Sequence, residues 1–272
     1  MPSDHPNERA ETTPPAVGRG RSAPGATATG DASRAGWIAW SLTAGLLAGL
    51  VAGVGGEAAF GLFQPPNRRP ADFAKLDSYE RSSVLSQIIR EETPPTEAKN
   101  AALTYGLLGL ALGGSLGLAG GLARRSPRAG VKAGLIGGML GGATGAGAAW
   151  PMTYLFYHYL DPESGVALPL LIRSGILLPV GAAAGLAFGS GSGGRRSIIR
   201  GLLGGIAGAA LGTMLFEVFN AAAFPLVRVT SPISGERLPR LLLIFCVTVF
   251  TSLGTAVGTQ AAGRSRPLAP PA

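Results

Sequence analysis

GVKAGLIGGMLGGATGAGAAW, residues 130–150, is the stretch that decides the fold. Glycine recurs at every fourth position, and a second row runs beside the first: Gly130, Gly134, Gly138 and Gly142, then Gly137, Gly141 and Gly145. In water each such glycine costs a helix about 1 kcal/mol relative to alanine. Inside a bilayer no water is present to hydrogen-bond the backbone, so the segment forms a helix in spite of the low helix propensity of glycine. Its small residues then form a flat stripe against which another helix can pack closely.

The composition supports lipid as the solvent. Of 272 residues, 46% are hydrophobic and 14% are charged, whereas soluble domains carry roughly 25% charged residues. The single cysteine, Cys246, lies in an apolar run, so neither a disulfide framework nor a cysteine metal site is expected. The net charge of +8 would suggest nucleic acid in a soluble protein. Here the basic residues lie between apolar segments, and no nucleic-acid partner is predicted.

Six apolar segments each approach the roughly 20 residues that a membrane-spanning helix requires. They are residues 36–63, 101–123, 131–157, 167–189, 197–223 and 240–262, with approximate bounds. We therefore predict an all-α polytopic membrane protein, a bundle of six glycine-rich transmembrane helices occupying residues 35–266. Residues 1–34 are polar and rich in Pro, Gly and Ala, which predicts a disordered cytoplasmic tail. Residues 267–272 form a short C-terminal tail.

The six segments resemble one another in pairs. Three of them end in similar text, GGLARRS (120–126), GSGGRRS (191–197) and AAGRSR (261–266). Three others contain AGLLAGLVAG (44–53), AGLIGGMLGG (133–142) and RGLLGGIAGA (200–209). This periodicity predicts three pseudo-repeated hairpins. The glycines predicted to pack helices are Gly45, Gly49, Gly53, Gly109, Gly113, Gly117, Gly134, Gly138, Gly142, Gly201 and Gly205.

Loop charges predict the orientation. The loops after the second and fourth segments hold Arg124, Arg125, Arg128, Lys132, Arg195, Arg196 and Arg200, and no acidic residue. The opposite side carries basic and acidic residues in balance. Basic loops stay in the cytoplasm, so we expect both termini to be cytoplasmic, in a bacterial inner membrane. Anionic lipid headgroups are expected at Arg124, Arg125, Arg195 and Arg196.

The long outer loop, residues 64–100, contains a short amphipathic helix by pattern. Proline pairs at 65–66 and 94–95 bracket the stretch from about Ala71 to Glu92, which has a partial apolar face. Two interpretations stay open. The helix lies on the membrane or caps the bundle, or it is a solvated connection.

Beyond the first four residues of each apolar segment, three ionisable residues fall within these segments: Glu57, Arg173 and Glu217. Counting about 1.5 Å per residue places all three towards the outer end of the bundle. Glu57 continues the stripe of Gly45, Gly49 and Gly53, and Glu217 continues that of Gly201 and Gly205, so each carboxylate should face a neighbouring helix. An intramembrane charge is a candidate functional group whose partner must be named. We predict that Arg173 pairs with Glu57, Glu217 or both.

Short motifs indicate no reaction. GGSLG (113–117) fits the serine-hydrolase pattern but lies within an apolar helix, and the only histidines are His5 in the tail and His158 near the outer surface. GSGSGG (189–194) fits a dinucleotide pattern but follows no strand. No catalytic, cofactor or metal site is predicted, and the chain is not expected to be an enzyme.

Three functions remain open. The best supported is a structural or assembly component of an inner membrane, packed through glycine stripes, with a membrane-protein partner or a second copy of itself. The alternative is a small-solute or proton-coupled transporter that uses Glu57, Arg173 and Glu217. The third is a pore formed by an oligomer.

Overall fold

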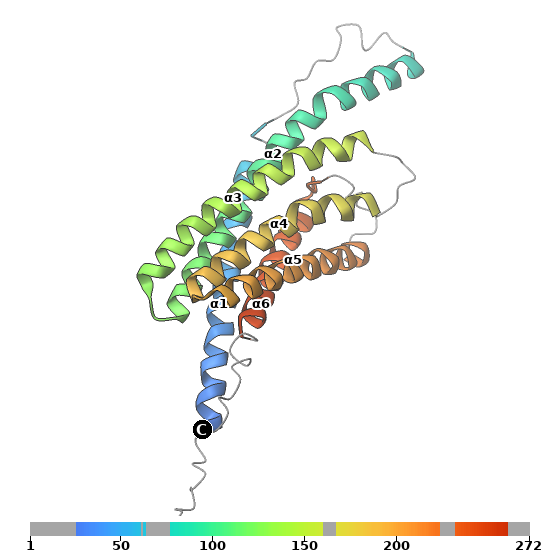
Figure 1. Cartoon of the computed structure of the whole chain (residues 1–272). Coiled ribbons are helices and arrows are strands. Elements are labelled where there is room, and N and C mark those ends of the chain that lie inside the picture. The colour runs from blue at the N-terminus through green and yellow to red at the C-terminus, as the bar shows by residue number, and fades with distance from the viewer. Residues whose placement is uncertain (1–25, 61, 64–76, 160–166, 224–231, 261–272) are drawn as a thin grey trace, which may run out of the picture.

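A computed structural model describes residues 26–60, 62–63, 77–159, 167–223 and 232–260 (Figure 1), and the regular secondary structure in these ranges is entirely α-helical. Six helices follow one another along the chain: α1 (Ala26–Ala59), α2 (Ser78–Ala123), α3 (Pro127–His158), α4 (Ala167–Ser192), α5 (Arg195–Ala223) and α6 (Arg237–Gln260). Helix α1 begins within the stretch predicted to be a disordered tail. Residues 1–25 and the C-terminal tail lie outside the described residues.

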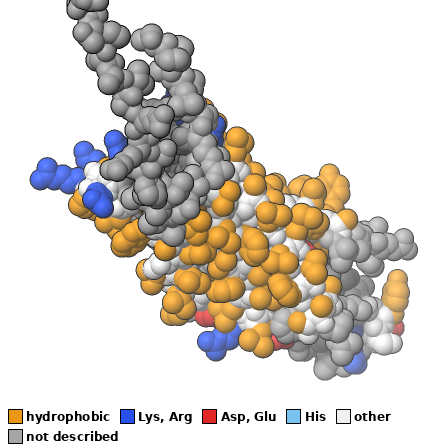
Figure 2. Space-filling view, turned by 90° about the horizontal axis from the view of Figure 1, so that it is seen from below, with side chains coloured by type: hydrophobic (Ala, Val, Ile, Leu, Met, Phe, Trp, Pro, Cys, Tyr) orange, Lys and Arg blue, Asp and Glu red, His pale blue; other side chains and the backbone are white. Residues whose placement is uncertain are grey.

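Five of these helices contain a segment long and apolar enough to cross a membrane: Gly36–Ala59, Thr93–Ala123, Ala167–Ser192, Arg195–Ala223 and Arg237–Gln260. Large apolar side chains also cover much of the outer surface (Figure 2). Val54 is 73% exposed and Met139 is 77% exposed, a degree of apolar exposure that soluble monomers avoid over large areas. The helices therefore indicate a multi-pass membrane protein.

Helix α3 differs from the prediction, because it is not among the five apolar segments found in the described residues. Glycines occupy positions that larger apolar side chains would fill, so no window of α3 is apolar enough, although its length of 32 residues is ample. Helix α3 nevertheless packs along α2. Gly130 faces Gly121 at one end of the interface, and Gly145 faces Tyr105 at the other.

Helix α2 also departs from the prediction, because it runs without interruption through Pro94 and Pro95. The expected short helix and the second span are thus parts of one 46-residue helix. Proline removes a backbone hydrogen-bond donor and usually kinks or ends a helix. Here the start of α2 is fixed independently, because Asp77 and Glu80 form a reciprocal capping box at its N-terminus. The first turns of α2 project beyond the other helices (Figure 1).

The helices form a bundle in which α2 contacts α1, α3 and α4, while α6 contacts α5 and α1. Helix α3 packs on both α2 and α4, and helix α5 packs on both α4 and α6. The turn between α2 and α3 meets the turn between α4 and α5, because Arg124 lies against Gly193. Trp37 of α1 contacts Phe188 near the end of α4, with ring centroids 6.1 Å apart. The start of the α1 span and both basic turns therefore share one end of the bundle.

Glycines lie where the helix backbones approach most closely. A Cβ atom added to Gly109 or Gly113 of α2 would overlap the carbonyl oxygen of Gly141 or Gly137 of α3. Added to Gly185 or Gly205, it would overlap a carbonyl oxygen across the α4–α5 interface. The row Gly137, Gly141 and Gly145 makes the tightest approach of α3 to α2. Gly138 and Gly142 of the other row leave 3.2 Å and 3.4 Å to their nearest neighbours, so they pack less closely.

Candidate functional site

The glycine stripe of α1 determines where Glu57 points. An added Cβ would overlap the Ser252 hydroxyl at Gly45, lie 2.8 Å from the Thr248 hydroxyl at Gly49 and lie 3.1 Å from Leu241 at Gly53. All three neighbours belong to α6, so the stripe of α1 faces α6. Ser41 strengthens this interface by donating a 2.6 Å hydrogen bond to the carbonyl oxygen of Ser252. Glu57, four residues beyond Gly53, therefore presents its carboxylate to the beginning of α6.

Arg240 is the partner of Glu57. Its Nε lies 2.7 Å from Oε1 and its Nη2 lies 2.9 Å from Oε2 of the carboxylate, which is a bidentate ion pair. The remaining Nη1 donates a 2.9 Å hydrogen bond to the carbonyl oxygen of Ser234. The guanidinium carbon also lies 3.5 Å from the centre of the Phe60 ring, within the range of a cation–π interaction. Arg240 is only 6% exposed, so its charge depends on these contacts.

A second cation, Arg237, lies at the edge of the same carboxylate. Its Nε is 3.6 Å from Oε2 of Glu57, and its side chain is 74% exposed. An exposed pair at this separation contributes little, typically below about 1 kcal/mol. Arg240 is therefore the cation that fixes Glu57.

Helix α5 repeats this arrangement against α4. Gly201 and Gly205 face Gly185 and Gly181 of α4, and Glu217 lies three to four turns further along the same face of α5. Its carboxylate accepts a hydrogen bond from Nη1 of Arg173. Arg173 is 1% exposed, and its guanidinium lies 5.3 Å from the Phe216 ring. The structure thus pairs Arg173 with Glu217, as expected, and gives Glu57 a different partner.

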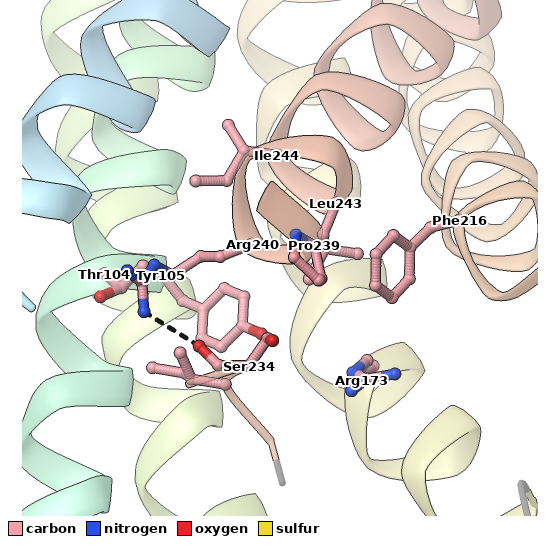
Figure 3. A pocket seen from close by; sticks show the side chains of 10 residues that line it. Thr104, Tyr105, Arg173, Phe216, Ser234, Pro239, Arg240, Leu243 and Ile244 are labelled. Atoms are coloured by element: carbon pink, nitrogen blue, oxygen red, sulfur yellow. Dashed lines mark hydrogen bonds between the residues drawn. The ribbon is translucent and has the colours of Figure 1, made fainter. Parts of the chain in front are cut away.

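Tyr105 of α2 lines the same small cavity as Arg240 and Arg173, the arginines of the two ion pairs (Figure 3). It is buried, and its hydroxyl donates a 2.8 Å hydrogen bond to the carbonyl oxygen of Pro232. Arg173, Arg240, Tyr105 and Thr104 all line one small cavity of about 10 Å³. That volume is about the minimum for one water molecule. The buried Thr104 hydroxyl has no hydrogen-bond partner, and a single water would satisfy it.

Further polar contacts surround this end of the bundle. Asn100 of α2 holds the chain beyond α1: its side-chain amide donates to the carbonyl oxygen of Phe63 at 2.9 Å, and its Oδ1 accepts from the Phe63 amide at 3.4 Å. The Tyr157 side chain on α3 lies beside the Glu97 carboxylate on α2. We name the set of Glu57, Arg240, Arg173, Glu217 and Tyr105 the ion-pair layer. Every described helix except α3 supplies a residue to it.

Sequence reasoning missed Arg240 because it is the first residue of the sixth apolar segment, 240–262, where a basic residue reads as a charge of the outer surface. Helix α6 begins at Arg237, so Arg240 stands in the first turn of that helix and points inward. A signal was present: Arg240 directly precedes the apolar run LLLIF at 241–245. A cation at the beginning of a predicted span is a candidate partner for Glu57.

The other residues singled out in the sequence are the arginines of the two basic turns, His158 and Ser115. Arg124, Arg125, Arg195 and Arg196 are all exposed at the two adjoining turns. The His158 ring packs edge-on against Tyr159, with centroids 4.8 Å apart. Ser115, the central residue of GGSLG, points its hydroxyl at the carbonyl oxygen of Leu112 within the same helix. Among the residues that the structure describes, no group of three His, Cys, Asp or Glu could hold a metal ion.

No protein-family model, curated protein or solved structure matches this chain. Its class therefore rests on the fold of the described residues, whose regular structure is helical and includes five apolar helices able to span a membrane.

Proposed function

We propose that this protein is a non-enzymatic structural or assembly component of a bacterial inner membrane. The ion-pair layer fixes the axial position of each helix relative to its neighbours. One observation carries the proposal. Glu57 and Glu217 are each engaged by a buried arginine, and the cavity beside these arginines holds about 10 Å³. A transporter in this state would have to open a path through two ion pairs.

The energetics agree with a registering role. Replacing a buried ion pair by apolar residues often leaves stability unchanged, yet removing one partner costs about 3–5 kcal/mol. A buried pair therefore adds little net stability but strongly penalises any arrangement that separates the two charges. Sliding α1 along α6 by one turn, about 5.4 Å, would separate Glu57 from Arg240. The same shift of α5 would separate Glu217 from Arg173.

The glycine stripes support the same function. Those of α1, α2 and α5 pack against neighbouring helices of the same chain. An oligomeric pore built by stacking exposed stripes would need these surfaces to be free. The stripes instead serve the internal packing of one chain, which favours the structural role.

The proposal includes six membrane spans with both termini in the cytoplasm. Helix α3 follows α2 in close backbone contact over the distance from Gly121 to Tyr105, about 24 Å at 1.5 Å per residue. If α2 crosses the hydrocarbon, a helix packed along it over this length crosses as well. The adjoining turns that carry Arg124, Arg125, Arg195 and Arg196 then face the cytoplasm.

The function is tested by neutralising each carboxylate with its shape retained, as Glu57→Gln and Glu217→Gln. The matched control is Glu236→Gln, because Glu236 is exposed and lies four residues before Arg240 in the sequence. We expect lower abundance in the membrane and a lower midpoint of thermal unfolding for both layer variants, with the control unchanged. Proteoliposomes should show no pH-dependent flux. Normal abundance together with lost pH-dependent flux would establish the transporter instead.

The topology is tested by cysteine labelling. Cys246 is buried and should stay unlabelled. An impermeant maleimide added to intact cells should label a cysteine placed at Tyr159, which is 60% exposed at the end of α3. A cysteine at Arg128, at the opposite end of α3, should react only after the membrane is permeabilised. Labelling of both positions in intact cells would show that α3 does not cross.

A further inference from the structure

A groove runs between α2 and α3 on the outer surface of the bundle. It encloses about 400 Å³, and its lining is almost entirely apolar. Glycines form its floor, at Gly114 of α2 and at Gly134 and Gly138 of α3. Leu118, Leu135 and Met139 form its walls. Leu135 and Met139 are 66% and 77% exposed, so these walls project from the bundle.

The shape of the groove suits a single extended hydrocarbon chain. Helices α2 and α3 are in backbone contact beneath it, so the space between their side chains is narrow. A packed helix is roughly 10–12 Å across and would rest on the walls rather than enter. A Cβ atom added to Gly114 would meet nothing closer than 3.7 Å, so the floor has room for an occupant. From Leu110 to Leu118 the groove extends about 12 Å along α2.

One end of the groove leads to positive charge. Arg128 stands three residues before Val131 and seven before Leu135, both of which line the groove, so it lies on the same face of α3. Arg125 in the turn from α2 to α3 and Arg128 in the first turn of α3 are both exposed, and no acidic residue lies between Arg124 and Arg128. The Ser126 side chain makes no capping hydrogen bond to the first turn of α3. The N-terminus of this 32-residue helix adds its own attraction for an anion.

We propose that the groove between α2 and α3 binds an anionic phospholipid, with one acyl chain over Gly114, Gly134 and Gly138 and the phosphate at Arg125 and Arg128. Arg128 lies about one helical turn beyond Val131, at the end of the apolar lining, and this order of apolar and basic residues matches the amphipathic structure of the lipid. The inference depends on the chain lying in a bilayer. It does not depend on the role of the ion-pair layer, which lies towards the other end of the helices.

Native mass spectrometry of the full chain in mild detergent tests this proposal, with dioleoylphosphatidylglycerol and dioleoylphosphatidylcholine as probes. The two lipids share their acyl chains and differ in charge. We expect preferential retention of the phosphatidylglycerol. The variants Arg125→Gln and Arg128→Gln should each lower that retention about fivefold, the effect of one basic residue at an anionic surface. The matched control Arg195→Gln/Arg196→Gln removes two charges from the start of α5, outside the groove, and should lower that retention by less than either of these variants.

The groove itself is tested by Gly114→Leu, which fills it, and by Leu135→Ala/Met139→Ala, which lowers exposed walls without touching internal contacts. Both should reduce retention of both lipids, and the second variant serves if the first fails to fold. The proposal is overturned if Arg195→Gln/Arg196→Gln lowers retention of phosphatidylglycerol as much as Arg125→Gln or Arg128→Gln does, because the lipid would then be attracted by the general surface charge. It is also overturned if the groove variants leave lipid retention intact, or if they abolish a dimer, which would identify a second copy as the occupant.

Discussion

The glycine-packed body of the bundle and the ion-pair layer at its end hold neighbouring helices together in opposite ways. In the body, helices meet because side chains are missing: Gly109 and Gly141 bring two backbones into contact. In the layer, helices meet because long side chains of opposite charge join across the gap, as Arg240 and Glu57 do. The body should therefore be sensitive to added atoms, and the layer to a removed partner.

The largest effect is expected from breaking one ion pair. Glu57→Leu leaves Arg240 as a charge that is 6% exposed and has lost its carboxylate. We expect the free energy of unfolding to fall by about 3–5 kcal/mol. Unfolding by sodium dodecyl sulfate in mixed micelles measures this quantity. The double variant Glu57→Leu/Arg240→Leu is the control, because it removes both charges and should restore most of the loss. If the double variant were as unstable as the single one, burial of a lone charge would not be the cause.

A smaller loss is expected from one added methyl group in the body. In Gly141→Ala the new Cβ would overlap the carbonyl oxygen of Gly109. Helices α2 and α3 must then move apart, at a cost of about 1–3 kcal/mol. The same unfolding assay applies, and a cysteine cross-link between α2 and α3 would report the separation. Unchanged stability and cross-linking would show that the close approach of α2 and α3 is not required.

Tyr105→Phe should have a milder effect, because it removes one hydrogen bond and no charge. The variant loses the bond to the carbonyl oxygen of Pro232 while its ring remains buried. We expect a loss of about 1 kcal/mol, together with faster proteolysis of the segment before α6. A loss as large as that of Glu57→Leu would mean that Tyr105 couples the two ion pairs.

The smallest effect should come from Gly147→Ala, six residues beyond Gly141 on the same helix. A Cβ atom at this position meets nothing within 4 Å. The substitution should be neutral or stabilise the helix by up to about 1 kcal/mol. Measured beside Gly141→Ala, it separates helix propensity from packing. A loss of stability equal to that of Gly141→Ala would show that this face of α3 is covered in the membrane.

The directions of the two carboxylates could be predicted from sequence, but only one of their partners. Glu57 and Glu217 continue small-residue stripes, and a stripe marks the face that meets another helix. Which helix it meets depends on tertiary arrangement. The stripe of α1 packs on the last helix of the chain, so its partner Arg240 lies 183 residues away. Spacing within one segment carries no information about such a pair.

Helices α2 and α3 show two other limits of sequence reasoning. Proline usually marks a boundary, yet α2 continues through Pro94 and Pro95, because tertiary packing can override local preference. Hydropathy identifies spans by their apolar content, and the glycines of α3 reduce that content while creating its interface with α2. The tighter row on α3 proved to be Gly137, Gly141 and Gly145. The sequence alone does not show which of two glycine rows on adjacent faces of one helix packs more closely against the neighbouring helix.

The length of α2 has a mechanical consequence. Forty-six residues make a rod of about 69 Å, more than twice the roughly 30 Å of hydrocarbon that a span must cross. From Ser78 to Thr93 the helix reaches about 23 Å past its apolar segment, and it is capped at the tip. A rotation of about 10° at the base would carry the tip by about 4 Å, given this rise. A fluorophore attached at position 79, near the tip, would thus report small tilts of the helices within the bundle. The same tilts would displace a probe inside the bundle far less.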